Sequence, residues 1–333
     1  MTGKGGTGKT TVAAALALAL AGGGKRVLLT EVEGRQGLAR LFDAPPLPYQ
    51  ELKVAVAPGG GEVRALAIDP KAALLEYLDM FYHLGRAGRM LEKVGAVDFA
   101  TTVAPGLRDV LLTGKVYEAV RRQEKINGRS KAGGQRHTYD AVVMDGPPTG
   151  RIAQFLNVND EVIGLTRMGP IRNQAAAIMG LLRSPQTAIH LTTVLEEMPV
   201  QETTDGVAEL TAIGLPIGAI VVNMVREPLL SPGERKRVLT GGIDRSEVMA
   251  GLSAAGLRRR EAASGNDTTP AALADALLAE GQRHAARVRM EQAERKQLAQ
   301  LDRPIYELPA LAGGVDLGDL YEMAGRLAEQ GAA

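Results

Sequence analysis

Eight residues near the N-terminus constrain this chain more than any other feature. Residues 3–10 are Gly-Lys-Gly-Gly-Thr-Gly-Lys-Thr, which fits the pattern G-x-x-x-x-G-K-[ST], and a helix-forming run follows at once. Glycines let the backbone curl around phosphate oxygens, while loop amides and the helix N-terminus supply hydrogen-bond donors. The pattern predicts that Lys9 meets the β- and γ-phosphates of a nucleotide and that the Thr10 hydroxyl binds Mg²⁺. We expect the phosphate-binding residues to be Gly3, Lys4, Gly5, Gly6, Thr7, Gly8, Lys9, Thr10 and Thr11.

The rest of the chain predicts an α/β fold. Apolar runs bounded by turn residues predict buried strands at 26–30, 139–144, 187–194, 219–223 and 304–308, with helix-length segments between them. This alternation predicts a doubly wound, mostly parallel sheet with helices on both faces. Together with the phosphate-loop pattern at residues 3–10, it predicts the P-loop NTPase fold. We expect a single P-loop ATPase domain over residues 1–333. Residues 70–122 contain no convincing strand and are rich in helix formers, so we expect an inserted helical subdomain there.

Composition excludes several kinds of chemistry. The 333 residues include no cysteine, which removes thiolate metal sites, disulfides and a cysteine nucleophile. The four histidines are far apart in sequence and form no ligand spacing. The net charge of +1 and the 3% aromatic content argue against a nucleic-acid partner. We find no leader and no integral membrane segment, and expect a cytoplasmic protein.

A second acidic motif follows the strand predicted at 139–144. Asp145 ends this strand and begins the segment Asp-Gly-Pro-Pro-Thr-Gly. A carboxylate at the carboxyl end of a parallel strand lies in the crevice where α/β folds bind ligands, placed to hold a Mg²⁺-bound water. Asp145 is therefore the second predicted metal residue beside Thr10. Asp140 begins the strand and is expected to be a turn residue.

Both motifs resemble those of one group of ATPases. Lys4 directly after the first glycine gives the deviant Walker A sequence K-G-G-x-G-K-T, and residues 145–150 are similar to the D-x-A-P-T-G segment of the arsenical-pump and tail-anchored-protein-targeting ATPases, the anion-transporting ATPase type. The resemblance implies a Mg²⁺-dependent ATP hydrolase that works as a dimer. It also implies that Lys4 acts in trans, on the phosphates bound by the partner subunit, and that Asp145 couples the nucleotide state to the shape of the protein.

The same resemblance assigns a water-orienting carboxylate after the strand at 26–30. The family carries D-P-A-H-S or similar at this point, and matching strand to strand and Leu38 to the family leucine places Glu33 on the aspartate. Glutamate is longer by one methylene, and the family proline is missing. Glu31 is the alternative candidate for this role.

Two further positions resemble the adenine site of the family. Asn223 ends a Val-Val-Asn strand, and Pro309 follows Leu308 at the end of the last strand, although the acidic pattern that should follow it is missing. Neither N-K-x-D nor T-K-x-D follows Asn223, so ATP is preferred over GTP. The alternative for Asn223 is a buried residue that caps the next turn.

The sequence says less about what the ATPase handles. We expect a homodimer or a heterodimer with a paralogue, and a protein or hydrophobic client. Leu and Met residues at helical spacing in the insert fit a client groove, although a helical layer packed on its own core needs the same residues. Two other functions stay open. One is a partition or division-site positioning ATPase, of which the acidic tail 316–329 disfavours the membrane-bound variant. The other is an ATP-binding scaffold with weak hydrolysis.

The start of the chain carries one more expectation. Only Met1 and Thr2 precede Gly3, whereas a phosphate loop follows a buried central strand. We expect that the first strand is truncated and that coding sequence upstream of Met1 specifies an apolar run.

Overall fold

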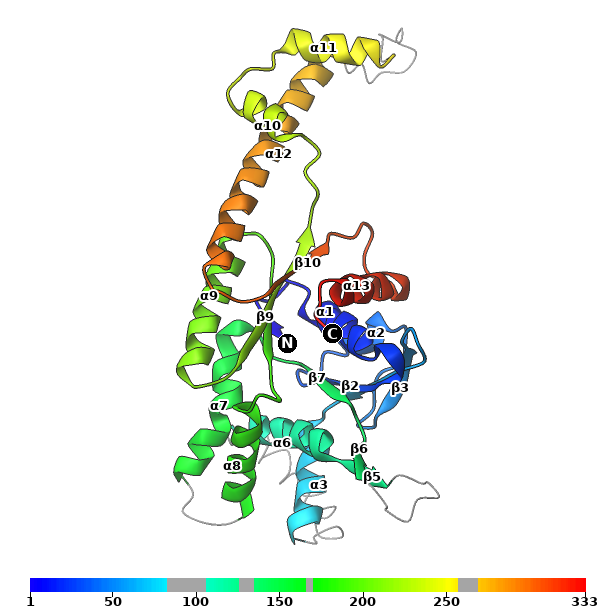
Figure 1. Ribbon diagram of the computed structural model, residues 1–333, viewed down its shortest axis with the longest axis vertical. Helices are drawn as coiled ribbons and strands as arrows, with labels where there is room; N and C mark the ends of the chain where they lie inside the picture. The colour runs from blue at the N-terminus through cyan, green and yellow to red at the C-terminus, as the bar shows by residue number, and fades with distance from the viewer. Residues whose placement is uncertain (83–105, 126–134, 166–169, 257–268) are drawn as a thin grey trace. The chain divides into compact units, whose positions relative to one another are not determined.

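The computed structural model describes residues 1–82, 106–125, 135–165, 170–256 and 269–333 (Figure 1). Its strands are β1 (Thr2–Gly3), β2 (Arg26–Glu31), β3 (Leu52–Val56), β4 (Glu62–Ala67), β5 (Gln123–Lys125), β6 (Gln135–His137), β7 (Ala141–Asp145), β8 (Ile189–Thr193), β9 (Ile217–Val225) and β10 (Ile305–Pro309). Its helices are α1 (Lys9–Leu20), α2 (Gly37–Leu41), α3 (Pro70–Tyr82), α6 (Leu107–Arg121), α7 (Thr149–Leu165), α8 (Pro170–Leu182), α9 (Glu197–Ala212), α10 (Pro232–Leu239), α11 (Arg245–Ala254), α12 (Pro270–Ala299) and α13 (Leu317–Glu329).

The strands form a mostly parallel sheet with the phosphate loop near its middle. One set of four has the order β3-β4-β2-β7 and the other has the order β1-β8-β9-β10. Two main-chain bonds join them at β7 and β1: Met1 N donates to Met144 O at 2.7 Å, and Gly146 N donates to Met1 O at 2.9 Å. The pairs of β2 with β4 and β7 are parallel, and only β3 among these strands runs antiparallel to its neighbour. The predicted α/β fold is confirmed.

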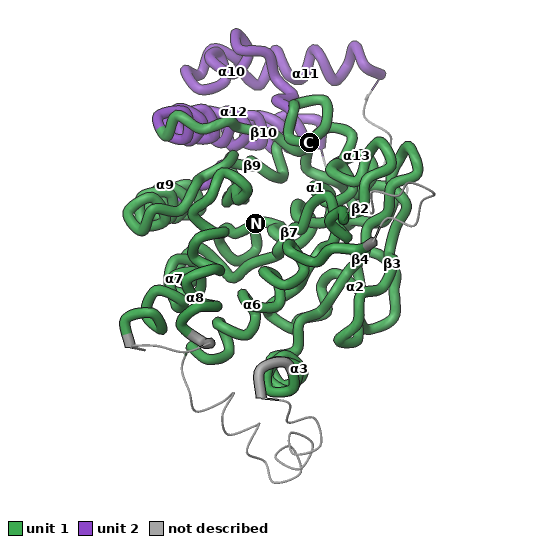
Figure 2. The backbone as a smooth tube through the Cα atoms, turned by 60° about the horizontal axis from the view of Figure 1, so that its bottom comes forward, with its two compact units in different colours: residues 1–194, 198–225, 301–333 green, residues 195–197, 226–300 purple. Residues whose placement is uncertain are grey.

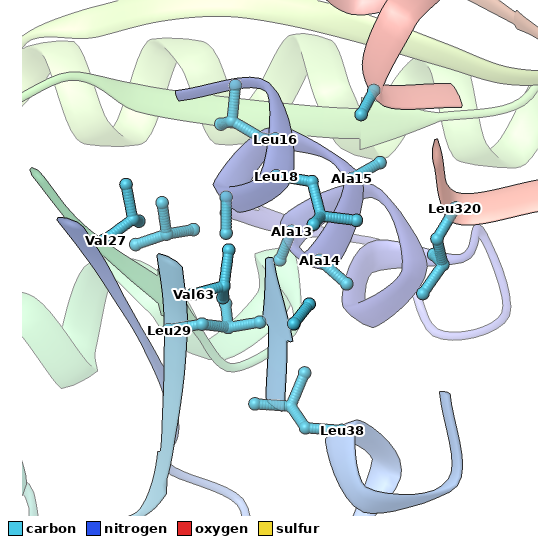
Figure 3. Close-up of a cluster of buried hydrophobic side chains, with 14 of the residues drawn as sticks. Ala13, Ala14, Ala15, Leu16, Leu18, Val27, Leu29, Leu38, Val63 and Leu320 are labelled. Atoms are coloured by element: carbon cyan, nitrogen blue, oxygen red, sulfur yellow. The ribbon is translucent and has the colours of Figure 1, made fainter. Parts of the chain in front are cut away.

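Helices cover both faces of this sheet (Figure 1). On one face, α1 packs between the strands and α13, and α2 closes the edge. Figure 3 shows this core, in which small alanines let α1 lie close to the sheet. Its labelled members are Ala13, Ala14, Ala15, Leu16, Leu18, Val27, Leu29, Leu38, Val63 and Leu320. On the other face, a second core joins side chains of α6, α7 and α9 to β2, β4 and β8.

The chain divides into two compact units (Figure 2). Unit 1, residues 1–194, 198–225 and 301–333, contains the sheet and every predicted site residue. Unit 2, residues 195–197 and 226–300, is helical, and within it Arg245 Nε of α11 donates to Asp275 Oδ1 of α12 at 2.6 Å. No helix in the described ranges is both long and apolar enough to cross a membrane.

Several elements differ from the sequence-based expectations. The hairpin of β3 and β4 was not expected, because both strands are short and the Gly-rich turn between them resembles a loop. The helices α7 and α8 fill a region where no helix was assigned. Of the expected insert at 70–122, the structure describes α3, α6 and the two residues that flank α6, 106 and 122. Residues 83–105 lie outside the described residues, and so does the part of the proposed client segment that falls within them.

Candidate functional site

The phosphate loop leaves β1 and enters α1 through a left-handed glycine. Gly8 is the residue before α1 and has φ 82° and ψ 27°, a conformation that costs any residue with a Cβ about 1–2 kcal/mol. A methyl group at Gly8 would also lie 2.4 Å from Asn223 Nδ2. Asn223 in turn donates from Nδ2 to the Thr7 carbonyl at 2.9 Å. Glycine is therefore required at position 8 both by the turn and by the approach of β9.

Thr10 and Asp145 meet at the carboxyl ends of the central strands. Thr10 Oγ1 donates to Asp145 Oδ2 at 2.7 Å, and the ammonium-bearing side chain of Lys9 is buried beside them. Asp145 is 7% exposed, and its Oδ1 has no hydrogen-bond partner among the described residues. Burial raises the pKa of Asp145 above its ordinary value, against the opposing effects of the Thr10 bond and of Lys9. The structure brings together the two residues that the sequence assigned to a metal.

Lys4 pairs with a residue that the sequence did not single out. Its Nζ donates to Glu202 Oε1 of α9, and Thr149 Oγ1, at the start of α7, donates to Glu202 Oε2 at 3.1 Å. Glu202 therefore contacts both the phosphate loop and the segment that follows Asp145. Both side chains of the ion pair are about one-third exposed, at 31% and 35%.

The two candidate carboxylates after β2 have different surroundings. Glu33 is partly exposed, and its Oε1 lies 3.6 Å from the Arg35 guanidinium. Glu31 is the last residue of β2 and is 2% exposed. Its Oε2 accepts a hydrogen bond from Leu38 N at 3.2 Å, while its Oε1 has no partner among the described residues. The water-orienting role of Glu33 stays a prediction.

The predicted adenine-side residues lie together at one end of the sheet. Asn223 is buried on β9, and Pro309 ends the neighbouring strand β10, where it pairs with Val225. Asn223 braces the phosphate loop through Thr7, which is more than the turn-capping alternative requires. Adenine contact by either residue stays a prediction.

The remaining predicted residues belong to the phosphate loop and the start of α1. Gly3, Gly6 and Gly8 have positive φ, Gly5 and Gly6 are exposed, Thr7 is buried, and Thr11 is half-buried on α1. Within the described ranges, no group of three or more His, Cys, Asp or Glu side chains is placed to hold a metal ion. His190 is on β8, His284 is on α12, His137 is exposed, and His83 lies outside the described residues.

Sequence reasoning missed Glu202 and gave Glu31 second place. Glu202 lies 198 residues from Lys4 in sequence, so no local pattern joins the two. Thr149 belongs to the Pro-Pro-Thr-Gly segment, which drew attention only for its resemblance. For Glu31 the signal was present, because it directly ends an apolar strand as Asp145 does.

A glycine loop between a central parallel strand and a helix, with a carboxylate on the next strand, defines the nucleotide-hydrolysing class of P-loop proteins. The model of one family within this class, described as anion-transporting ATPase, matches residues 1–185. The chain belongs to the anion-transporting ATPase family. It is an ATP-binding protein and an ATP hydrolase.

Curated relatives extend the similarity over the whole chain. ATPase BagA of Mycobacterium tuberculosis is 52% identical over 331 residues, covering 99% of this chain and 92% of the relative. An arsenical pump-driving ATPase of Escherichia coli is 28% identical over 241 residues, 67% of this chain and 38% of the relative. ATPase GET3 of Kluyveromyces lactis is 26% identical over 257 residues, 67% of this chain and 70% of the relative.

Proposed function

We propose that this ATPase is Mg²⁺-dependent and acts as a dimer whose conformation follows the bound nucleotide. One observation carries the magnesium part: Thr10 Oγ1 and Asp145 Oδ2 are in contact at 2.7 Å, with the other Asp145 oxygen buried and unpaired among the described residues. Hydroxyl and carboxylate oxygens are the ligands that Mg²⁺ prefers, usually with waters and nucleotide phosphates completing the shell. The residues therefore fit this cation.

The phosphate loop supplies the remaining roles. Lys9 and the loop amides bind the β- and γ-phosphates, and a bound Mg²⁺ neutralises charge that develops on them during transfer. Glu33 orients the attacking water. Asn223 and Pro309 contact adenine from the ends of β9 and β10.

The dimer part of the proposal concerns Lys4. Its ammonium group points to Glu202 of α9 and leaves the phosphate cradle of its own loop to Lys9. This placement supports a role on the nucleotide of a partner subunit, either a second copy of this chain or a paralogue. ATP would then close the dimer, and hydrolysis would reopen it.

The hydrolysis part is tested by turnover with and without Mg²⁺. The chain should release phosphate from ATP only when Mg²⁺ or Mn²⁺ is present, and Lys9→Ala should abolish nucleotide binding or turnover. Hydrolysis at an undiminished rate in excess chelator would contradict the proposal.

One observation favours a slower enzyme as the second candidate. Glu33 lies near Arg35, at 3.6 Å, so its carboxylate must leave this ion pair to orient water. A nucleotide-binding scaffold with weak hydrolysis is the result if it does not leave. Single-turnover hydrolysis, measured together with nucleotide affinity, separates an active ATPase from a scaffold. An active ATPase converts its bound ATP to ADP within one cycle of opening and closing, whereas a scaffold keeps the bound ATP intact.

For the client, we propose a hydrophobic ligand that enters a cavity between α3, α6 and α8. The cavity has a volume of about 860 Å³, and its lining includes Ala73, Val110, Leu111 and Ala177 beside charged residues of α6. Leu74, one of the leucines of the expected insert, is instead buried in the core, and Met179 of α8 is buried as well.

The cavity is tested with a hydrophobic fluorescent dye. Ala177→Trp places a large ring in the cavity and should weaken dye binding at least fivefold. Ala176→Trp, on the exposed side of the same helix, is the matched control and should leave dye binding unchanged. Equal affinities in both variants would remove the support for a client site here.

A further inference from the structure

We propose that Glu31 and Asp145 form a carboxylate pair that binds a divalent cation of the Mg²⁺ or Mn²⁺ type beside Thr10 even before a nucleotide arrives. The inference rests on the proposed Mg²⁺ dependence and goes further, because it gives the protein a cation affinity of its own. It also gives Glu31 a role distinct from that of Glu33.

The two carboxylates are placed side by side by the sheet. Glu31 ends β2, Asp145 ends β7, and these residues are paired in the parallel register of the two strands. Neighbouring strands lie about 4.8 Å apart, so both side chains leave the sheet at the same edge. They are 2% and 7% exposed. Two acidic groups are thus buried next to each other at the end of the phosphate loop.

Each carboxylate has one oxygen that no described group satisfies. Glu31 Oε1 and Asp145 Oδ1 are both buried without a hydrogen-bond partner among the described residues. Buried polar atoms are normally hydrogen-bonded. Lys9 and the Met1 ammonium group act electrostatically on Asp145, but neither donates a hydrogen bond to its Oδ1. A cation between the two carboxylates would supply the missing partner for both.

The space around Gly37 shows where the Glu31 carboxylate lies relative to Thr10. A methyl group placed on Gly37 would lie 3.9 Å from Thr10 Oγ1 and 4.0 Å from Glu31 Oε2. Thr10 Oγ1 is itself 2.7 Å from Asp145 Oδ2. Thr10 Oγ1 and Glu31 Oε2 therefore both lie within 4 Å of one point beside Gly37, while Asp145 contacts the Thr10 hydroxyl directly.

This donor set matches the coordination habits of a small hard cation. Mg²⁺ is usually bound through one or two carboxylates, with waters and phosphates filling the other positions of an octahedron. Oxygen donors without imidazole or thiolate favour Mg²⁺ and Mn²⁺ over zinc and copper. Among the residues that the structure describes, no group of three or more His, Cys, Asp or Glu side chains could hold a metal ion, so waters would fill the remaining positions before a nucleotide arrives.

A simpler role for Glu31 is to cap α2. Its Oε2 accepts from Leu38 N at 3.2 Å, near the start of that short helix. This bond uses one oxygen and needs no negative charge. Glu31→Gln separates the roles, because the amide oxygen can still accept from Leu38 N while the charge is lost.

The experiment is a titration of the nucleotide-free full chain with Mn²⁺, in which free Mn²⁺ is followed by electron paramagnetic resonance. The wild type should bind one Mn²⁺ per chain with a Kd below about 1 mM, within the range of weak carboxylate sites. Glu31→Gln and Asp145→Asn should each weaken binding at least tenfold. Glu33→Gln removes the same charge two residues away and should change the affinity less than twofold.

Folding of each variant is checked separately by thermal unfolding in chelator. When Mg²⁺ is then added in excess, it should raise the Tm of the wild type more than that of Glu31→Gln, since a ligand stabilises the state that binds it. Equal Mn²⁺ affinity and an equal Mg²⁺-induced Tm rise in wild type and Glu31→Gln would overturn the proposal that Glu31 and Asp145 bind the cation together. Wild-type protein that binds no Mn²⁺ below 1 mM would do the same. Neither result touches Mg²⁺-dependent hydrolysis, which fails only if turnover is independent of the cation.

Discussion

At the level of one residue, Lys4 is held by an ion pair within the chain, and the proposed dimer would require this pair to open. Its ion pair with Glu202 is about one-third exposed, so it contributes about 1 kcal/mol or less and is easily exchanged. Glu202→Gln should release Lys4 and lower the protein concentration at half-maximal ATPase activity by roughly two- to fivefold. Glu209→Gln, exposed on the same helix, is the control. If ATPase activity depends on protein concentration in the same way in the wild type, Glu202→Gln and Glu209→Gln, the ion pair with Glu202 does not restrain Lys4.

His190 makes stability depend on pH. Burial lowers the pKa of His190 from 6.5 to about 4, and Ala219 N donates to its Nδ1 at 3.0 Å, which requires that nitrogen to be unprotonated. Between pH 6.5 and 4 the unfolded chain binds the extra proton, so stability is full above pH 6.5 and falls as pH falls. The loss is up to about 3 kcal/mol.

The measurement is denaturant unfolding at pH 7 and pH 4.5. His190→Gln keeps an acceptor for Ala219 N but does not titrate, so its loss over this interval should be smaller than that of the wild type. The exposed His137→Gln should behave as the wild type does. Identical losses in wild type and His190→Gln would refute the assignment.

At the level of elements, the helix α13 closes the core over α1. Leu320 is fully buried against the alanine face of α1, as Figure 3 shows, and joins the two ends of the chain in one cluster. Leu320→Ala should lower the free energy of unfolding by about 2–5 kcal/mol, the usual cost of a large-to-small change in a core. Leu317→Ala, at an exposed position of α13, should cost far less. Equal midpoints of denaturation in the two variants would show that α13 is not part of the core.

Some of the site residues could be predicted from the sequence, and others could not. The phosphate loop and Asp145 were predictable because each is a short pattern whose chemistry is local. For Glu31 the local signal, its place directly after an apolar run, was outweighed by the resemblance that places Glu33 on the family aspartate, and the structure shows that Glu31 ends β2 and is buried. Glu202 was out of reach, because its contact with Lys4 depends on the order of strands in the sheet.

At the scale of the whole molecule, the central claim is that each active site takes its lysines from two subunits. In the proposed dimer, Lys9 would serve the nucleotide of its own chain, and Lys4 would serve that of the partner. A C2 dimer then contains two equivalent composite sites. Lys9→Ala should lose nucleotide binding or turnover, and Lys4→Ala should keep binding and lose turnover.

Mixing these two variants tests the claim most directly. In a mixed dimer, the Lys4→Ala subunit keeps Lys9 and receives Lys4 from its Lys9→Ala partner, so one of the two sites is intact. Half of the dimers in an equal mixture are mixed, and ATPase activity should return to about a quarter of the wild-type value. A mixture as inactive as either variant alone, in protein shown to exchange subunits, would contradict the shared active site.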